Sequence, residues 1–189
     1  MSVYTEITIA CWAVLLTYWF VNASKVKAAV QTQTPLSRYV YLFFLASGFV
    51  ITYARIFAVG PLGYQLIPVN DLSGIVGLAV CIGGVAFAIW ARRTLGNNWS
   101  GEVTLKKEHE LVQSGPYKIV RHPIYTGFEI GLLGVAITIG QVKGLLGLSI
   151  VFAAHYYKTT MEEKIMYAQF PTQYADYAKR VKRLVPFVF

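Results

Sequence analysis

The chain of 189 residues is 56% hydrophobic, and only 14% of its residues are charged, against about 25% in an average soluble protein. This composition excludes an ordinary soluble domain and is typical of an integral membrane protein. The net charge of +8 alone would suit a nucleic-acid-binding protein, but the basic residues flank hydrophobic runs, where attraction to anionic lipid headgroups explains them. We therefore expect membrane lipids, and no nucleic acid, among the partners.

Five hydrophobic runs are long enough, or nearly so, to cross a hydrocarbon core of about 30 Å, which takes roughly 20 helical residues. They lie at 3–23, 39–59, 72–91, 124–140 and 142–160. The first has the length of a full span and no basic flank before it, so we expect it to be retained rather than cleaved. The predicted fold is all-α: a membrane helical bundle of about five spans with a C-terminal cytoplasmic helical tail.

Basic residues are distributed unevenly among the segments that join these spans. They gather in 24–38, in 92–121 and after residue 160, whereas the two opposite connections contain only Lys143. Basic segments are retained on the cytoplasmic side of a membrane. We therefore expect the N-terminus outside and the C-terminus in the cytoplasm.

The third and fourth spans are rich in glycine and include the spacing Gly127-x3-Gly131. Small residues at this spacing let two helix backbones approach closely. Two interpretations stay open. The glycines either pack against a neighbouring helix or form a small-residue wall beside a groove for a lipid tail, which would make Gly127 and Gly131 substrate-binding residues.

The segment SGPYKIVRHPIYTG, between spans three and four, carries polar groups that a membrane anchor does not need. Pro123 suits the first turn of a helix, which places His122 at the cap with Arg121 beside it. The positive end of the helix and the adjacent charge attract anionic groups. Taken singly, Arg121 is also explained as an interfacial anchor and His122 as an N-cap.

Aromatic and glycine residues flank this candidate anion site. Gly115 precedes a proline, and the pair favours a sharp turn at which the backbone comes close to a ligand. Tyr117 and Tyr125 supply ring faces and hydroxyl groups. The segment therefore suits a ligand that has both polar and aromatic parts.

Spans four and five are separated by little more than GQVKG and should form a tight antiparallel helical hairpin. The hairpin returns Glu162 and Glu163 to the level of His122. Their carboxylates can accept hydrogen bonds from ribose hydroxyls or an amino group, or can face a sulfonium. A zwitterionic, nucleoside-bearing cofactor would fit this set, although a solvated helix end also explains the two glutamates when they are taken alone.

Other polar or reactive residues lie within the spans. Glu129 lies about two turns into span four, where a carboxylic acid is costly and suggests function. It either faces a substrate channel or pairs with another helix. His155 on span five, Cys11 and Cys81 are expected to pack, so we predict no metal or redox site.

Four motifs, in this order, resemble the isoprenylcysteine carboxyl methyltransferase family: LGNNWS from Leu95, HELVQSGPYKIVRHPIYTG from His109, EE at Glu162, and FPTQYADYAKRVKRLVP from Phe170. The wider group includes phospholipid N-methyltransferases, membrane thiol methyltransferases and, more remotely, sterol reductases. The resemblance implies a membrane-embedded enzyme that binds S-adenosylmethionine in a cytoplasmic pocket over the last two spans. It divides a single domain, 1–189, into N-terminal spans (1–91) and a catalytic region (92–189).

The resemblance and the local chemistry together assign site residues. The expected cofactor contacts are His109, Glu110, Leu111, Val112, Gly115, Tyr117, His122, Pro123, Ile124, Tyr125 and Glu162. The expected catalytic set is Arg121, His122, Tyr125, Glu162 and Glu163. On the substrate side, Lys158 takes the place of a family arginine, which keeps the charge but loses the bidentate fork for a carboxylate. Glu129 is the other expected polar substrate contact.

The leading prediction for the acceptor is the carboxylate of an isoprenylcysteine-like lipid, which needs alignment and desolvation but no general base. A phospholipid amine or a thiol is the alternative, and an amine would need Glu162 or Glu163 as a base. A membrane scaffold would explain the spans but not the tyrosine, histidine and glutamate residues. A small transporter would need polar residues along several spans, and a nicotinamide-dependent reductase would need more spans than this chain has.

Overall fold

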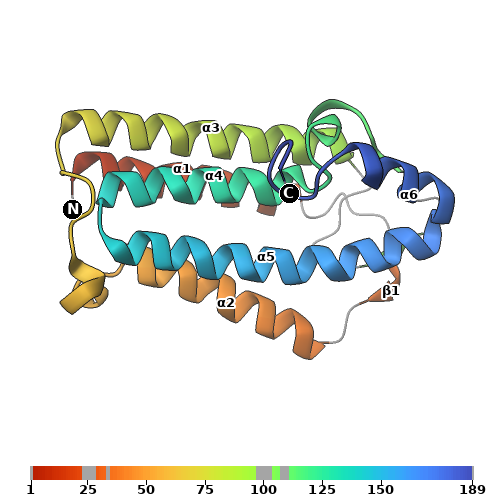
Figure 1. The fold of residues 1–189 in the computed structure, drawn as a ribbon, viewed down its shortest axis with the longest axis horizontal. Helices are drawn as coiled ribbons and strands as arrows, with labels where there is room; N and C mark the ends of the chain where they lie inside the picture. Colours follow the sequence, from red (N-terminus) through yellow and green to blue (C-terminus); the bar gives the residue numbers. More distant parts are fainter. Residues whose placement is uncertain (1, 23–28, 33–34, 97–103, 107–110, 189) are drawn as a thin grey trace.

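The structure is a computed structural model that describes residues 2–22, 29–32, 35–96, 104–106 and 111–188. Five long helices run roughly along one axis, and a short sixth helix lies at one end of the bundle (Figure 1). The helices are α1 (Val3–Val21), α2 (Pro35–Tyr53), α3 (Asp71–Leu95), α4 (Pro123–Ile139), α5 (Val142–Gln169) and α6 (Pro171–Arg180). Two short strands, β1 (Ala29–Thr32) and β2 (Thr104–Lys106), pair antiparallel, and 3-10 helices η2 (Arg55–Phe57), η3 (Gly60–Gly63) and η5 (Gly115–Lys118) lie in the connections.

Within the described residues, α1, α2 and α3 are each long and apolar enough to cross a membrane. The prediction of an all-α, multi-pass membrane protein is therefore confirmed. Helix α4 is apolar but has only 17 residues, and α5 carries charged side chains in its second half, so the count of five spans stays a prediction. The second predicted span was placed too late, because α2 ends at Tyr53 and two 3-10 turns follow it.

Glycines hold α3 against α4 at backbone contact distance. A Cβ atom on Gly84 would overlap the backbone of Gly131 and Gly127, and one on Gly127 would overlap Ala88 and Gly84. Gly131 also lies against the indole of Trp12 from α1. The packing interpretation therefore accounts for Gly127 and Gly131, and the lipid-groove interpretation of these two residues does not fit their contacts.

The predicted hairpin of α4 and α5 is present. Only Gly140 and Gln141 join the two helices, which run antiparallel beside each other (Figure 1). Gly140 closes α4 in the left-handed conformation, with φ of 68°, which glycine adopts without a steric penalty. The hairpin brings the end of α5 back to the level at which α4 begins.

Lys143, one of two basic residues with Arg55 at the opposite end of the bundle from the basic segments, is almost fully buried. Its ammonium group donates to the carbonyl of Thr52 at 2.7 Å and to that of Ala54 at 3.1 Å, at the C-terminal end of α2. The negative end of a helix stabilises such a cation. Lys143 therefore ties α5 to α2 and does not present a charge to the membrane surface.

Candidate active site

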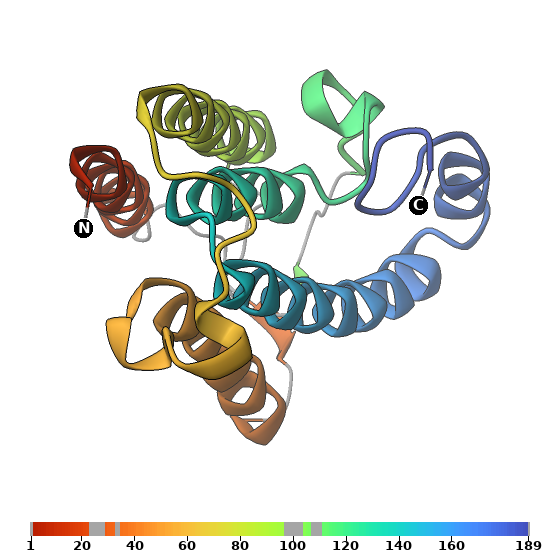
Figure 2. The ribbon, with the colours of Figure 1, turned by 60° about the vertical axis from the view of Figure 1, so that its left-hand side comes forward.

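The end of the chain folds back over the start of α4 and fixes its cap (Figure 2). Val120 and Lys182 form a parallel bridge, and the backbone N–H of His122 donates to the carbonyl of Arg183 at 3.1 Å. The Thr126 hydroxyl donates to the carbonyl of Leu184 at 2.7 Å. These contacts hold the segment before α4 rigidly between the bundle and the C-terminal tail.

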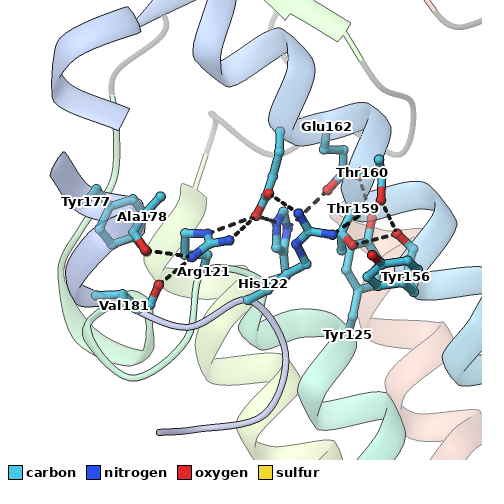
Figure 3. A network of polar contacts seen from close by, with 12 residues as sticks. Arg121, His122, Tyr125, Tyr156, Thr159, Thr160, Glu162, Tyr177, Ala178 and Val181 are labelled. Atoms are coloured by element: carbon cyan, nitrogen blue, oxygen red, sulfur yellow. Dashed lines mark hydrogen bonds and ion pairs between the residues drawn. The ribbon is translucent and has the colours of Figure 1, made fainter. Parts of the chain in front are cut away.

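Glu163 is the centre of a buried ion-pair network. One of its oxygens accepts from the Nε atom of Arg121 at 2.8 Å and lies 3.1 Å from the Nε2 atom of His122. The other oxygen accepts from Arg183 at 2.6 Å. Arg121 also donates to the carbonyls of Ala178 and Val181 in and after α6 (Figure 3).

These partners occupy the acceptor positions of the Glu163 carboxylate, and only 5% of its side chain is exposed. The prediction that Arg121 and Glu163 lie beside His122 fits the structure. Their contacts, however, join α4, α5 and the tail to one another, so we interpret both residues as holding the site together rather than as reacting groups.

Glu162 is the more accessible of the two glutamates, with 23% of its side chain exposed. One oxygen accepts the hydroxyl proton of Tyr125 at 2.6 Å, and the other lies 3.4 Å from the Nδ1 atom of His122. The rings of His122 and Tyr125 stack with centroids 6.0 Å apart. The N-terminal end of α4 therefore carries a group of three side chains in contact: His122, Tyr125 and Glu162 (Figure 3).

The two glutamates and the histidine set one another's ionisation. Burial alone would raise the pKa of Glu163, but the hydrogen bonds and charges of His122 and Arg121 outweigh it and lower that pKa from 4.5 to about 2. Burial would likewise lower the pKa of His122, but hydrogen bonds to Glu162 and Glu163 raise it above its ordinary value. Burial opposes ionisation of Glu162 as well, yet His122 and Lys158 lower its pKa. The site therefore carries carboxylates at neutral pH.

The structure describes all but two of the remaining predicted cofactor contacts, and their role stays a prediction. Gly115 has φ of 57°, a conformation that favours glycine, and opens η5. Tyr117 is buried, and its carbonyl accepts the hydroxyl of Tyr177 at 2.6 Å. Pro123 is buried, whereas the others are half-buried: Leu111, Val112 and Ile124. His109 and Glu110 lie outside the described residues, so their role stays a prediction.

Lys158 lies one turn before Glu162 on α5 and is only 6% exposed. Its ammonium group is 4.4 Å from the ring centroid of Tyr41 on α2, within the range of a cation–π contact. The prediction from sequence placed Lys158 on the substrate side. The structure places this cation one turn closer to the start of α5 than Glu162, and its role on the substrate side stays a prediction.

Glu129 pairs with another helix, which was one of the two alternatives from sequence. A carboxylate oxygen of Glu129 lies 2.6 Å from the Nδ1 atom of His155 on α5, and His155 is 1% exposed. The His155 ring stacks on that of Tyr125, with centroids 4.7 Å apart. The expectation that His155 packs is thus incomplete, because the residue also contacts the carboxyl group of Glu129.

Sequence reasoning missed Arg183 as a site residue. From sequence, Arg183 is one of the basic residues after residue 160 that indicate the orientation of the chain, and it lies in the tail motif that begins at Phe170. Its guanidinium donates both to Glu163 and, at 3.3 Å, to the hydroxyl of Thr160. Because the partners are about twenty residues apart, no local spacing in the sequence indicates the pair.

A family model described as phospholipid methyltransferase matches residues 72–173. Protein-S-isoprenylcysteine O-methyltransferase B of Arabidopsis thaliana is 31% identical over 115 residues, which cover 59% of this chain and 58% of that protein. The cobalt-zinc-cadmium resistance protein CzcN of Cupriavidus metallidurans is 30% identical over 95 residues, which cover 49% of this chain and 44% of that protein.

A solved structure shares the fold as well. The eukaryotic intramembrane Ras methyltransferase ICMT (isoprenylcysteine carboxyl methyltransferase) matches with a TM-score of 0.57 and 27% sequence identity. The match covers 84% of this chain and 55% of that one. These matches confirm the resemblance inferred from the motifs, and the chain spans about half the length of the curated relatives that it matches.

Proposed function

Because the chain belongs to the phospholipid methyltransferase family, we propose that it is a membrane-embedded enzyme that transfers a methyl group from S-adenosylmethionine to a lipophilic acceptor. One observation carries this proposal. His122, Tyr125 and Glu162 come from two helices and meet in a single hydrogen-bonded group where α4 begins. A membrane scaffold does not need this buried polar group.

The residues present fit the cofactor. Glu162 is ionised, partly exposed and able to accept hydrogen bonds from an ammonium group or a ribose hydroxyl. Leu111, Val112 and the turn at Gly115 would offer backbone groups and apolar contacts, and Tyr117 would offer its ring. When bound, S-adenosylmethionine supplies an electrophilic methyl group on a sulfonium. His122 and Tyr125 hold the Glu162 carboxylate in one position, which aligns whatever it binds.

The proposed acceptor is the carboxylate of an isoprenylcysteine-like lipid. Lys158 supports this choice because it holds a positive charge at a buried position, one helical turn on the membrane side of Glu162. For a carboxylate, the chain needs only to exclude water and align the reactants. Relatives named as metal-resistance proteins match the chain, as isoprenylcysteine methyltransferases do. Phospholipid amines and thiols are the alternative acceptors.

We further propose that α4 and α5 cross the membrane together with α1, α2 and α3. The charge asymmetry of the connections then places the N-terminus outside and the candidate site at the cytoplasmic face. Two basic residues lie at the opposite end of the bundle, and Lys143 is one that presents no charge there because it is buried against the end of α2; the exposed Arg55 is the other. The cofactor would enter from the cytoplasm, and the acceptor from the bilayer.

The test is transfer of the labelled methyl group of S-adenosylmethionine to the native lipid extract, followed by identification of the product. We expect a labelled lipophilic product that depends on Glu162. The matched control is Glu6→Gln, which removes an exposed carboxylate from the first turn of α1. No labelled product with the folded wild type, or equal activity in Glu162→Gln, would contradict the proposal.

A further inference from the structure

A row of polar side chains descends from the site into the bundle along the facing sides of α4 and α5. On α4 and its N-cap they are Tyr125, Glu129 and His122, and on α5 they are Glu162, Lys158 and His155. Spacings of three, four and seven residues place such groups on one face of a helix. With a rise of 1.5 Å per residue, the seven residues from His122 to Glu129 span about 10 Å. The Glu129–His155 pair therefore lies well inside the bundle, below the proposed cofactor site.

Packing alone does not explain this pair. The second carboxylate oxygen of Glu129 is buried and has no hydrogen-bond partner among the described residues. A buried polar atom without a partner costs free energy, and an acid at membrane depth is costly in itself. Three aromatic rings surround the imidazole of His155. Their centroids lie 4.7 Å (Tyr125), 5.7 Å (Phe128) and 6.0 Å (Tyr41) from the centroid of the His155 ring. A polar pair kept in such surroundings suggests a role in the chemistry.

The contact between Glu129 and His155 has the geometry of a histidine that a carboxylate orients as a general base. A carboxylate 2.6 Å from the Nδ1 atom of a histidine favours the tautomer that is protonated there, which leaves Nε2 as the proton acceptor. One aromatic ring, that of Tyr125, separates His155 from the carboxylate of Glu162. The pair is thus next to the proposed reaction site, on its membrane side.

We propose that His155, oriented by Glu129, accepts the proton that a lipophilic thiol releases when its sulfur is methylated. The inference rests on the proposed function and extends it to a second class of acceptor. The sulfur lone pair forms the new bond to the methyl carbon, the carbon–sulfonium bond breaks with its electrons passing to the cofactor sulfur, and the thiol proton passes to His155. S-adenosylhomocysteine and the protonated imidazole are the other products, so atoms and charge balance.

The neighbouring charges favour a thiol over an amine. A thiol is neutral and enters an apolar region without the desolvation cost of an ammonium ion. Lys158 lies on the same face of α5 and repels an ammonium ion, whereas it stabilises the negative charge that develops on a sulfur atom losing its proton. Among the described residues, Tyr41 from α2 and Tyr125 from α4 lie against the His155 ring, and Glu162 from α5 lies beyond Tyr125.

The experiment compares two acceptors of equal chain length, dodecanethiol and dodecanoic acid, in purified wild type, Glu129→Gln and His155→Gln. Methyl transfer from labelled S-adenosylmethionine is followed from about pH 6 to about pH 9, and S-adenosylhomocysteine affinity checks the fold. General bases contribute roughly 10²- to 10⁴-fold. We expect each variant to lose about 100-fold in kcat with the thiol near neutral pH and far less with the acid. The fall in kcat of the variants with the thiol should become smaller as the pH rises, because the thiol then loses its proton to the solvent and needs no base from the protein.

The outcomes separate the two proposals. An equal loss with both acceptors, or a loss that does not change with pH, would indicate a structural role for the pair and overturn the inference. A wild type that methylates the acid but not the thiol would also overturn it, while leaving the proposed function intact. Failure of the wild type to methylate any acceptor would instead overturn the proposed function, and the inference with it.

Discussion

Replacing Glu163 by glutamine should destabilise the protein through the C-terminal tail. The substitution keeps the shape of the side chain but removes the charge that faces Arg121 and Arg183. A pKa lowered from 4.5 to about 2 corresponds to about 3 kcal/mol, at about 1.4 kcal/mol for each tenfold change in the protonation equilibrium. This value agrees with the roughly 3–5 kcal/mol lost when one partner of a buried ion pair is removed.

Thermal unfolding in detergent measures this loss, with a thiol-reactive dye that reports exposure of the buried Cys81. For a chain of this size, a change of about 3 kcal/mol lowers Tm by roughly 6–12 °C. The exposed control Glu6→Gln should stay within about 0.5 kcal/mol of the wild type. A Tm of Glu163→Gln within about 2 °C of the wild type would refute the account of the network.

The pH dependence provides a second readout of the same substitution. Because the folded pKa of Glu163 is lowered, its stabilisation is complete above the unfolded pKa near 4.5 and is lost as pH falls from there towards about 2. Wild type should therefore lose stability between about pH 5 and about pH 3, and Glu163→Gln should lose less over the same interval. Parallel acid profiles for the two proteins would contradict the assignment.

Three further predictions concern the packing and orientation of the bundle. Gly84→Ala should lower Tm, because the added Cβ overlaps the α4 backbone and should cost about 1–3 kcal/mol of folding free energy. The adjacent Gly83→Ala adds its Cβ in open space and should leave Tm unchanged or raise it. Lys143→Met should cost about 1–3 kcal/mol by leaving two carbonyls at the end of α2 without their donor, and should leave S-adenosylhomocysteine affinity unchanged in calorimetry. In intact cells, an impermeant thiol reagent should label a cysteine at the exposed Tyr64 but not one at the exposed Asp176, and the reverse pattern would invert the proposed orientation.

Local sequence signals predicted the parts of the site that depend on helix ends and a short connection. Pro123 marks the first turn of α4, and only the short GQVKG segment separates the fourth and fifth hydrophobic runs. Together these features were sufficient to bring Glu162 to the level of His122. They were sufficient because two helices joined by so short a turn pack antiparallel beside each other.

The sequence did not indicate that Glu163 would face the tail while Glu162 stayed partly exposed. Consecutive residues on a helix point about 100° apart, so Glu162 and Glu163 necessarily face different neighbours. Which of them faces the tail depends on where the chain returns after α6. That return places Arg183 against Glu163 and leaves Glu162 partly exposed, and neither local spacing nor composition encodes it.

Hydropathy also failed to fix two features inside the bundle. It extended the second span past Tyr53, because the apolar residues after α2 belong to 3-10 turns rather than to the helix. It identified Glu129 as unusual but left its partner open, since a buried acid signals only that something must compensate it. His155 supplies that partner from the other arm of the hairpin.

Calorimetric titration of S-adenosylhomocysteine tests the central claim most directly, because it measures the cofactor site without requiring the acceptor. His122→Ala and Glu162→Gln should each weaken binding by about 1–3 kcal/mol, or roughly 5- to 150-fold, since each leaves a buried polar partner unmatched. His155→Gln, one aromatic ring further from the site, should bind as the wild type does. Equal affinity in the wild type, His122→Ala and Glu162→Gln, all with an intact thermal transition, would contradict a cofactor site at the start of α4.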